Sequence, residues 1–220
     1  MIIKAYFQNL FPFLFITWVL YVICFRFNLI KPKKMAREIV VLYISAFITF
    51  VPFFGLSLAD LFLSVNPNYS IGSVALMLVL LWPKILDKPL LSTRHLLIFC
   101  SWNVVISLIL FSSTLGLMPY DLYALGYSFS WWFIAMALLT LLAIWSWYPL
   151  SFIFLAYIAA FNLKVLPSYN FFDYITDGFL FIMSAGVLLF LAFQPKNSIE
   201  AEGLRSQAPA ASPPTPQGEK

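Results

Sequence analysis

Charged residues are scarce in this chain of 220 residues: Asp, Glu, Lys and Arg make up 10% of it, whereas a soluble domain carries about 25%. Hydrophobic residues reach 62%. The few charges form short clusters between apolar stretches, and each stretch approaches the roughly 20 residues that a helix needs to cross a bilayer. The sequence therefore predicts an all-α, polytopic transmembrane helical bundle, of the type found in a bacterial inner membrane, with no soluble domain.

Cysteine and histidine are also scarce. Cys24 and Cys100 lie in apolar stretches without a Cys-x-x-Cys pair, and His95, the single histidine, has no cysteine or acidic residue beside it. We expect structural roles for these three residues and no cofactor.

The net charge of +4 comes from basic residues in short connections, so no basic domain is available to bind nucleic acid. The lipid bilayer is the predicted surrounding.

Apolar windows predict seven membrane spans. They cover residues 5–25, 39–60, 69–85, 96–118, 128–147, 149–166 and 171–193. Residues 128–166 are too many for one helix that rises 1.5 Å per residue, and Pro149 divides them because proline cannot donate a helical hydrogen bond. If residues 128–166 cross only once, the count falls to six. Residues 1–194 thus form the bundle, and the Pro/Ala-rich segment 195–220 is predicted to be a disordered cytoplasmic tail.

Lysine and arginine predict the orientation of the bundle. They gather after the first and third spans, at Arg26, Lys31, Lys33, Lys34, Arg37, Lys84, Lys88 and Arg94. Basic connections stay in the cytoplasm. Connections 61–68, 119–127 and 167–170 hold no lysine or arginine, so we expect them, and the N-terminus, to face outward.

Four aspartates fall at the predicted outer ends of the spans. They are Asp60, Asp121, Asp173 and Asp177. Lys4 and Lys164 are the lysines near that surface, so the face is net acidic and suited to a cation, a metal ion or an amine. Asp121 follows Pro119, where aspartate is also ordinary turn chemistry.

Structural roles are the alternative for these residues. Asn170 precedes Asp173 by three positions, which predicts a helix start with Asn170 as the cap and Asp173 in the first turn. Asp173 and Asp177 are four apart and are predicted to share one face of that helix. Asp60 is predicted to end a span, where the helix dipole disfavours an anion. We expect water, Lys164 or a bound cation to compensate for it.

One predicted span also carries a polar stripe. Cys100, Asn103, Ser107 and Thr114 follow helical spacing and are predicted to face protein rather than lipid. Residues of this kind are usually packing devices between membrane helices. Asn103 is also a candidate for lining a polar path.

Three functions remain open at this point. The leading hypothesis is a non-catalytic membrane component that binds a membrane-protein partner or helps to assemble an envelope complex, because no catalytic constellation is complete. Ser57, for example, lacks the glycines and the histidine of a hydrolase nucleophile. The second is a small carrier or channel for a cation or amine, lined by Asp60, Asp173, Asp177 and Asn103. The third is an enzyme that acts on a lipid-linked substrate at the outer interface, which requires at least two of the four aspartates to converge.

Overall fold

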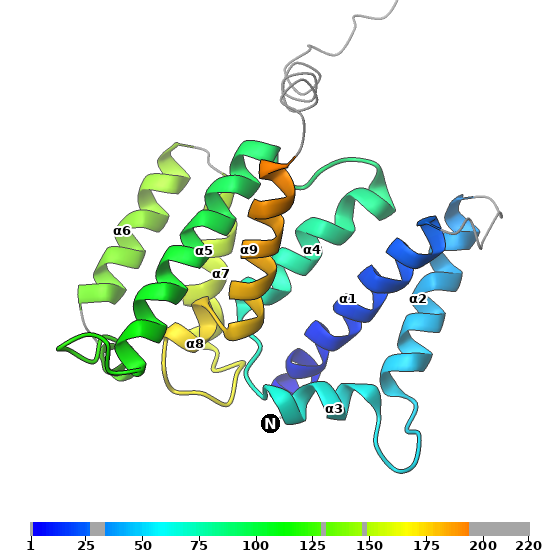
Figure 1. Ribbon diagram of the computed structural model, residues 1–220, viewed down its shortest axis with the longest axis horizontal. Coiled ribbons are helices and arrows are strands. Elements are labelled where there is room, and N and C mark those ends of the chain that lie inside the picture. The colour runs from blue at the N-terminus through cyan, green and yellow to red at the C-terminus, as the bar shows by residue number, and fades with distance from the viewer. Residues whose placement is uncertain (1, 27–33, 129–130, 147–148, 194–220) are drawn as a thin grey trace, which may run out of the picture.

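The computed structural model describes residues 2–26, 34–128, 131–146 and 149–193 (Figure 1). Within these ranges the regular structure is entirely helical, which confirms the predicted all-α class. The predicted tail 195–220 lies outside the described residues, as do Lys31 and Lys33.

The described helices follow one another along the chain with short connections. They are α1 Ile2–Arg26, α2 Lys34–Phe50, α3 Leu58–Val65, α4 Ile71–Leu86, α5 Thr93–Thr114, the 3₁₀ helix η1 Tyr123–Tyr127, α6 Trp131–Trp145, α7 Leu150–Asn162, α8 Phe172–Ile175 and α9 Gly178–Ala192. The longer helices run between two ends of the molecule, and α3 and α8 lie at the end that also holds the N-terminus (Figure 1). Residues 61–68, 119–127 and 167–170, which were predicted to be outer connections, also lie at that end. We call it the acidic end, because it carries the four aspartates.

Residues 39–60 do not form one helix, so that predicted span is wrong. Helix α2 ends at Phe50, because Pro52 disfavours helical backbone in the residue before it. A tight turn follows, in which Phe54 and Gly55 have φ angles of 55° and 87°. Ser57 then caps a separate short helix, α3. Asp60 therefore lies at the start of a helix and not at the end of one.

Residues 171–193 also form two helices rather than one. Thr176 is extended, with φ −141° and ψ 156°, and it separates α8 from α9. Asp177 is the N-cap of α9, whereas Asp173 lies in the first turn of α8. The prediction that the two aspartates share one helical face is therefore wrong.

Two groups of helices pack side by side. Helix α1 contacts α2, α3 and α4, while α5 packs on α9 and α6 packs on α7. Helix α4 joins the groups through contacts with α7, α8 and α9. Gly72 permits this approach, because a Cβ atom there would lie 2.4 Å from Leu180 Cδ2 and 2.5 Å from the Ile175 carbonyl oxygen. The start of α4 thus sits directly against the break between α8 and α9.

Much of the described surface is apolar. Tyr6–Cys24 within α1 and the whole of α5 are long and apolar enough to cross a membrane. Five shorter apolar helical segments accompany them, Glu38–Phe50, Ile71–Leu86, Trp131–Trp145, Leu150–Asn162 and Gly178–Ala192. Large exposed side chains such as Phe47, Leu142 and Phe190 occur along these helices. This surface is compatible with a membrane setting.

Candidate functional site

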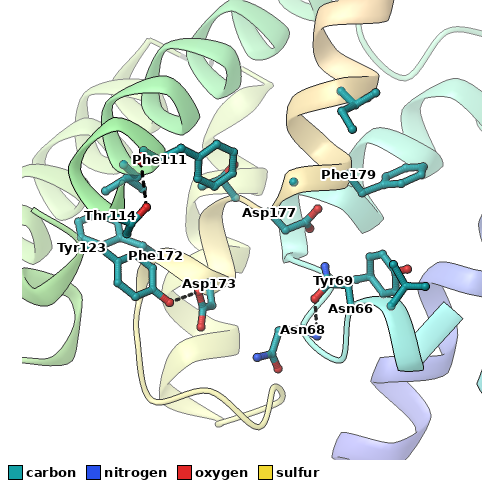
Figure 2. A pocket seen from close by; sticks show the side chains of 15 residues that line it. Asn66, Asn68, Tyr69, Phe111, Thr114, Tyr123, Phe172, Asp173, Asp177 and Phe179 are labelled. Carbon is teal, nitrogen blue, oxygen red and sulfur yellow. Dashed lines mark hydrogen bonds between the residues drawn. The ribbon is translucent and has the colours of Figure 1, made fainter. Parts of the chain in front are cut away.

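A pocket of about 630 Å³ lies at the acidic end, between the two groups of helices (Figure 2). Its lining comes from the end of α3, the connection to α4, the end of α5, η1, α8 and the start of α9. The lining residues are Val65, Asn66, Asn68, Tyr69, Leu110, Phe111, Thr114, Tyr123, Phe172, Asp173, Thr176, Asp177, Gly178, Phe179 and Ile182. The volume falls within the range of roughly 300–1,000 Å³ that small-molecule sites occupy.

Asp177 links two helix starts on one wall of this pocket. Its Oδ1 accepts a hydrogen bond of 2.9 Å from the N–H of Leu180, in the first turn of α9. Its Oδ2 accepts 2.7 Å bonds from the N–H of Ser70, the N-cap of α4, and from the hydroxyl of Ser73. Asp177 is buried, with 8% of the residue exposed, and the N-terminal dipoles of both helices favour a negative charge there. Asp177 is therefore a structural lock between α4 and α9.

Asp173 is held differently, on the opposite wall. The hydroxyl of Tyr123 donates a 2.6 Å hydrogen bond to Oδ1 of Asp173 (Figure 2). Burial raises the pKa of Tyr123, and the hydrogen bond and charge of Asp173 raise it further, so the phenol stays protonated at neutral pH. Within the described part of the chain, Oδ2 of Asp173 receives no hydrogen bond. One oxygen of this carboxylate is thus available to a ligand.

Asn170 fixes the position of Tyr123 relative to α8. Its Nδ2 donates to the carbonyl of Tyr123 at 2.9 Å, and its Oδ1 accepts from the N–H of Phe172 at 2.9 Å. The prediction that Asn170 is the N-cap is wrong, because the N-cap of α8 is Phe171, whereas the predicted place of Asp173 in the first turn is confirmed. The bond from the Phe172 N–H to Asn170 closes a local turn just before α8. Gly126 leaves room for this amide, since a Cβ there would lie 1.9 Å from Asn170 Oδ1.

The polar stripe on α5 divides into a buried part and an exposed part. Cys100, Asn103 and Ser107 are fully buried, as predicted. Ser107 forms a 2.5 Å hydrogen bond with Thr176, and Asn103 donates to the Phe99 carbonyl. Thr114 is exposed at the rim of the pocket, so the prediction that it faces protein is wrong. Helix α5 ends at Thr114, where the bundle no longer encloses it.

Asp60 belongs to a capping box rather than to the pocket. Its Oδ2 accepts from the N–H and the hydroxyl of Ser57 at 2.9 and 2.6 Å, and its own N–H donates to Ser57 Oγ at 3.1 Å. The side-chain and backbone hydrogen bonds from Ser57 lower the pKa of Asp60. The expected conflict with the helix dipole is therefore wrong, because Asp60 lies in the first turn of α3. The signal missed in the sequence is Ser57-x-x-Asp60.

The remaining predicted residues lie away from the pocket. Asp121 is exposed, and its Oδ1 accepts from the N–H of Ala124 at 3.2 Å, which is turn chemistry. Lys164 follows α7, and its Nζ lies 6.0 Å from the centre of the Tyr169 ring. Two of the four aspartates therefore share the pocket, and the other two do not. Among the described residues, no group of three or more His, Cys, Asp or Glu side chains is placed to hold a metal ion.

The pocket combines negative charge with aromatic walls. Its lining holds two carboxylates, and none of the lining residues is Lys, Arg or His. Phe11 stacks on Tyr69 with the ring centres 4.0 Å apart and meets Phe179 edge-on at 4.7 Å. Burial, followed by the charge of Asp177, raises the pKa of Tyr69 to about 12. Carboxylates and ring faces are both attractive to cations.

Comparison with family models, with curated proteins and with solved structures finds no match to this chain. A function can therefore be inferred only from the residues of the pocket and their chemistry. Both carboxylate oxygens of Asp177 already accept hydrogen bonds from the starts of α4 and α9, and Asp173 hydrogen-bonds to a phenol of raised pKa. This arrangement is suited to binding rather than to general acid–base catalysis.

Proposed function

We propose that this chain is a polytopic membrane protein that binds a small cation or amine in the pocket at its acidic end, as a carrier or a receptor. The observation that carries the proposal is the pocket lining, which holds two carboxylates and no basic side chain. A positively charged ligand would face a negative wall and a neutral, hydrogen-bonding tyrosine. The same lining would repel anions.

The proposed spans are α1, α2, α4, α5, α6, α7 and α9. The shorter ones, of 13–17 residues, measure about 20–26 Å at 1.5 Å per residue, somewhat less than the roughly 30 Å of a hydrocarbon core. Helices of this length are accommodated by local thinning of the bilayer and by flanking residues. Lys84, Lys88 and Arg94 lie around the α4–α5 connection, away from the acidic end, so we propose that the acidic end faces outward.

Binding can be tested by thermal unfolding of the detergent-solubilised protein. Sodium, calcium, choline and spermidine are compared with glutamate and phosphate at equal ionic strength. A cation at 100 times its dissociation constant stabilises the folded state by about 2.7 kcal/mol, so at least one cation or amine should raise the unfolding temperature. Asp173→Asn should abolish that rise.

The matched control is Asp121→Asn, which removes an aspartate of the same end that lies outside the pocket. It should leave the response to the cation unchanged. Stabilisation by an anion, or an equal response in Asp173→Asn and the parent protein, would contradict the proposal.

Partner binding remains a second candidate, because α6 is peripheral. It packs mainly on α7, and the large side chains Trp131, Leu142 and Trp145 are exposed. A photo-crosslinking residue at position 142 in the native membrane should give a defined protein adduct if a partner helix covers this face. Adducts with lipid alone would count against the second candidate.

A further inference from the structure

We propose that the tight turn Phe53–Leu56, with Phe54 at its tip, inserts into the lipid leaflet beside the acidic end and anchors that end of the bundle. The inference rests on the proposed membrane location. It concerns a segment between α2 and α3 that does not line the pocket.

The turn is closed by its own backbone. The N–H of Phe53 donates to the Leu56 carbonyl at 2.9 Å, and the N–H of Leu56 donates to the Phe53 carbonyl at 3.3 Å. Pro52, just before it, has no N–H to satisfy. Pairing of backbone polar groups is what an apolar medium demands of any segment that enters it. The backbone groups of Phe53 and Leu56 are therefore already paired within the turn and would not need water in an apolar medium.

Phe54 occupies a position that ordinarily favours glycine or asparagine. Its φ of 55° lies in the left-handed region, where a bulky side chain is a genuine outlier. The ring is nevertheless fully exposed, at 108% of its reference area, and packing within the described structure does not compensate for the backbone strain. Such strain at an exposed tip points to an interaction made outside the chain.

The surface around the tip continues the outer face of α2. Phe53 meets Phe47 of α2 edge-on, with ring centres 6.4 Å apart. Tyr43 and Phe47 are exposed along α2, and Phe53 and Leu56 are exposed beside Phe54. If α2 faces lipid, the turn continues that apolar face past the end of the helix, and the connection between α2 and α3 extends beyond α3 (Figure 1).

Lipid fits this surface better than a protein partner does. Residues 39–59 contain no Asp, Glu, Lys, Arg or His, and residues 52–56 carry no side chain that forms hydrogen bonds. Protein interfaces have a polar rim and roughly one hydrogen bond per 100–200 Å². An uncharged aromatic tip at the edge of a bundle matches the apolar wedge of an interfacial element.

The experiment uses the full-length chain in phosphatidylcholine vesicles, with Cys24→Ala and Cys100→Ala as background. A nitroxide label is attached at Phe54→Cys, and its collisions with oxygen and with a water-soluble nickel chelate are measured. Oxygen concentrates in lipid and the chelate in water. We expect the Phe54 label to be at least several-fold more accessible to oxygen than to the chelate. The label at Leu56→Cys is a second measurement on the same turn.

Two controls separate this inference from the proposed function. Leu108→Cys, exposed in the middle of α5, should report lipid if the bundle is in the membrane, and Asp121→Cys should report water. A Leu108 label in contact with the chelate would overturn the membrane location itself. With Leu108 in lipid, chelate access at positions 54 and 56 would overturn only the lipid anchor. Protection of both positions from both reagents would show a protein contact and would overturn it equally.

Discussion

Asp60 and Asp177 both stabilise the start of a helix at the acidic end, yet they do so on different scales. Asp60 exchanges hydrogen bonds with Ser57, three residues away, on the surface of α3. Asp177 caps α9 and also accepts bonds from Ser70 and Ser73, more than a hundred residues earlier in the chain. The first holds one turn of one helix. The second holds two groups of helices together.

Removal of the buried carboxylate should have the largest effect. Asp177→Ala leaves the N–H groups of Ser70 and Leu180 and the hydroxyl of Ser73 without an acceptor. Each buried unsatisfied donor costs roughly 1–3 kcal/mol, so we expect a loss of about 3 kcal/mol or more in the free energy of unfolding. Denaturant unfolding in detergent measures it. A loss below about 0.5 kcal/mol would show that Asp177 does not lock the two groups.

Close packing at the same junction should contribute less. Gly72→Ala places a Cβ against the Ile175 carbonyl and the Leu180 side chain, and overpacking of this kind costs about 1–3 kcal/mol. Gly186→Ala in α9 is the matched control, because its Cβ would meet no atom within 4 Å. The control should be neutral, or stabilising by up to about 1 kcal/mol through helix propensity. Equal effects of the two substitutions would refute a tight contact between α4 and the break before α9.

Most helices of the fold could be predicted from local signals in the sequence, namely apolar windows and prolines. Apolar windows located five of the helices, α1, α4, α5, α6 and α7, to within about five residues at their ends, and Pro149 correctly separated α6 from α7. Pro52 and the pair Ser57 and Asp60 carried equally local information on the end of α2 and the start of α3. The continuous hydrophobicity of residues 39–60 nevertheless favours a single span, which is why the end of α2 was not predicted.

The pocket could not be predicted in the same way. Asp177 and Ser73 are separated by 104 positions, and nothing in their local sequence indicates that they meet. The break at Thr176 did have a local signal, because Asp177 and Gly178 are weak helix formers and aspartate favours the N-cap position. The contacts of Thr176 with α5 and of α8 and α9 with α4 had none. The convergence of Asp173 with Asp177, and the absence of Asp60 from their pocket, follow from packing rather than from spacing.

The smallest expected effect concerns Asp60 and depends on pH. Hydrogen bonds from Ser57 lower the pKa of Asp60 in the folded protein below its ordinary value of about 3.9. A group with a lowered folded-state pKa stabilises the protein above its unfolded-state pKa and loses that contribution as the pH falls through the folded-state value. Asp60→Asn should therefore lower the unfolding temperature slightly at pH 6, and the difference from the parent protein should shrink towards pH 3. Thermal unfolding over this range measures it, with Asp121→Asn as the exposed comparison. A difference in unfolding temperature that stays constant with pH would mean that the Asp60 charge does not stabilise α3. Asp60 and Asp177 would then not share the role of stabilising a helix start through their charge.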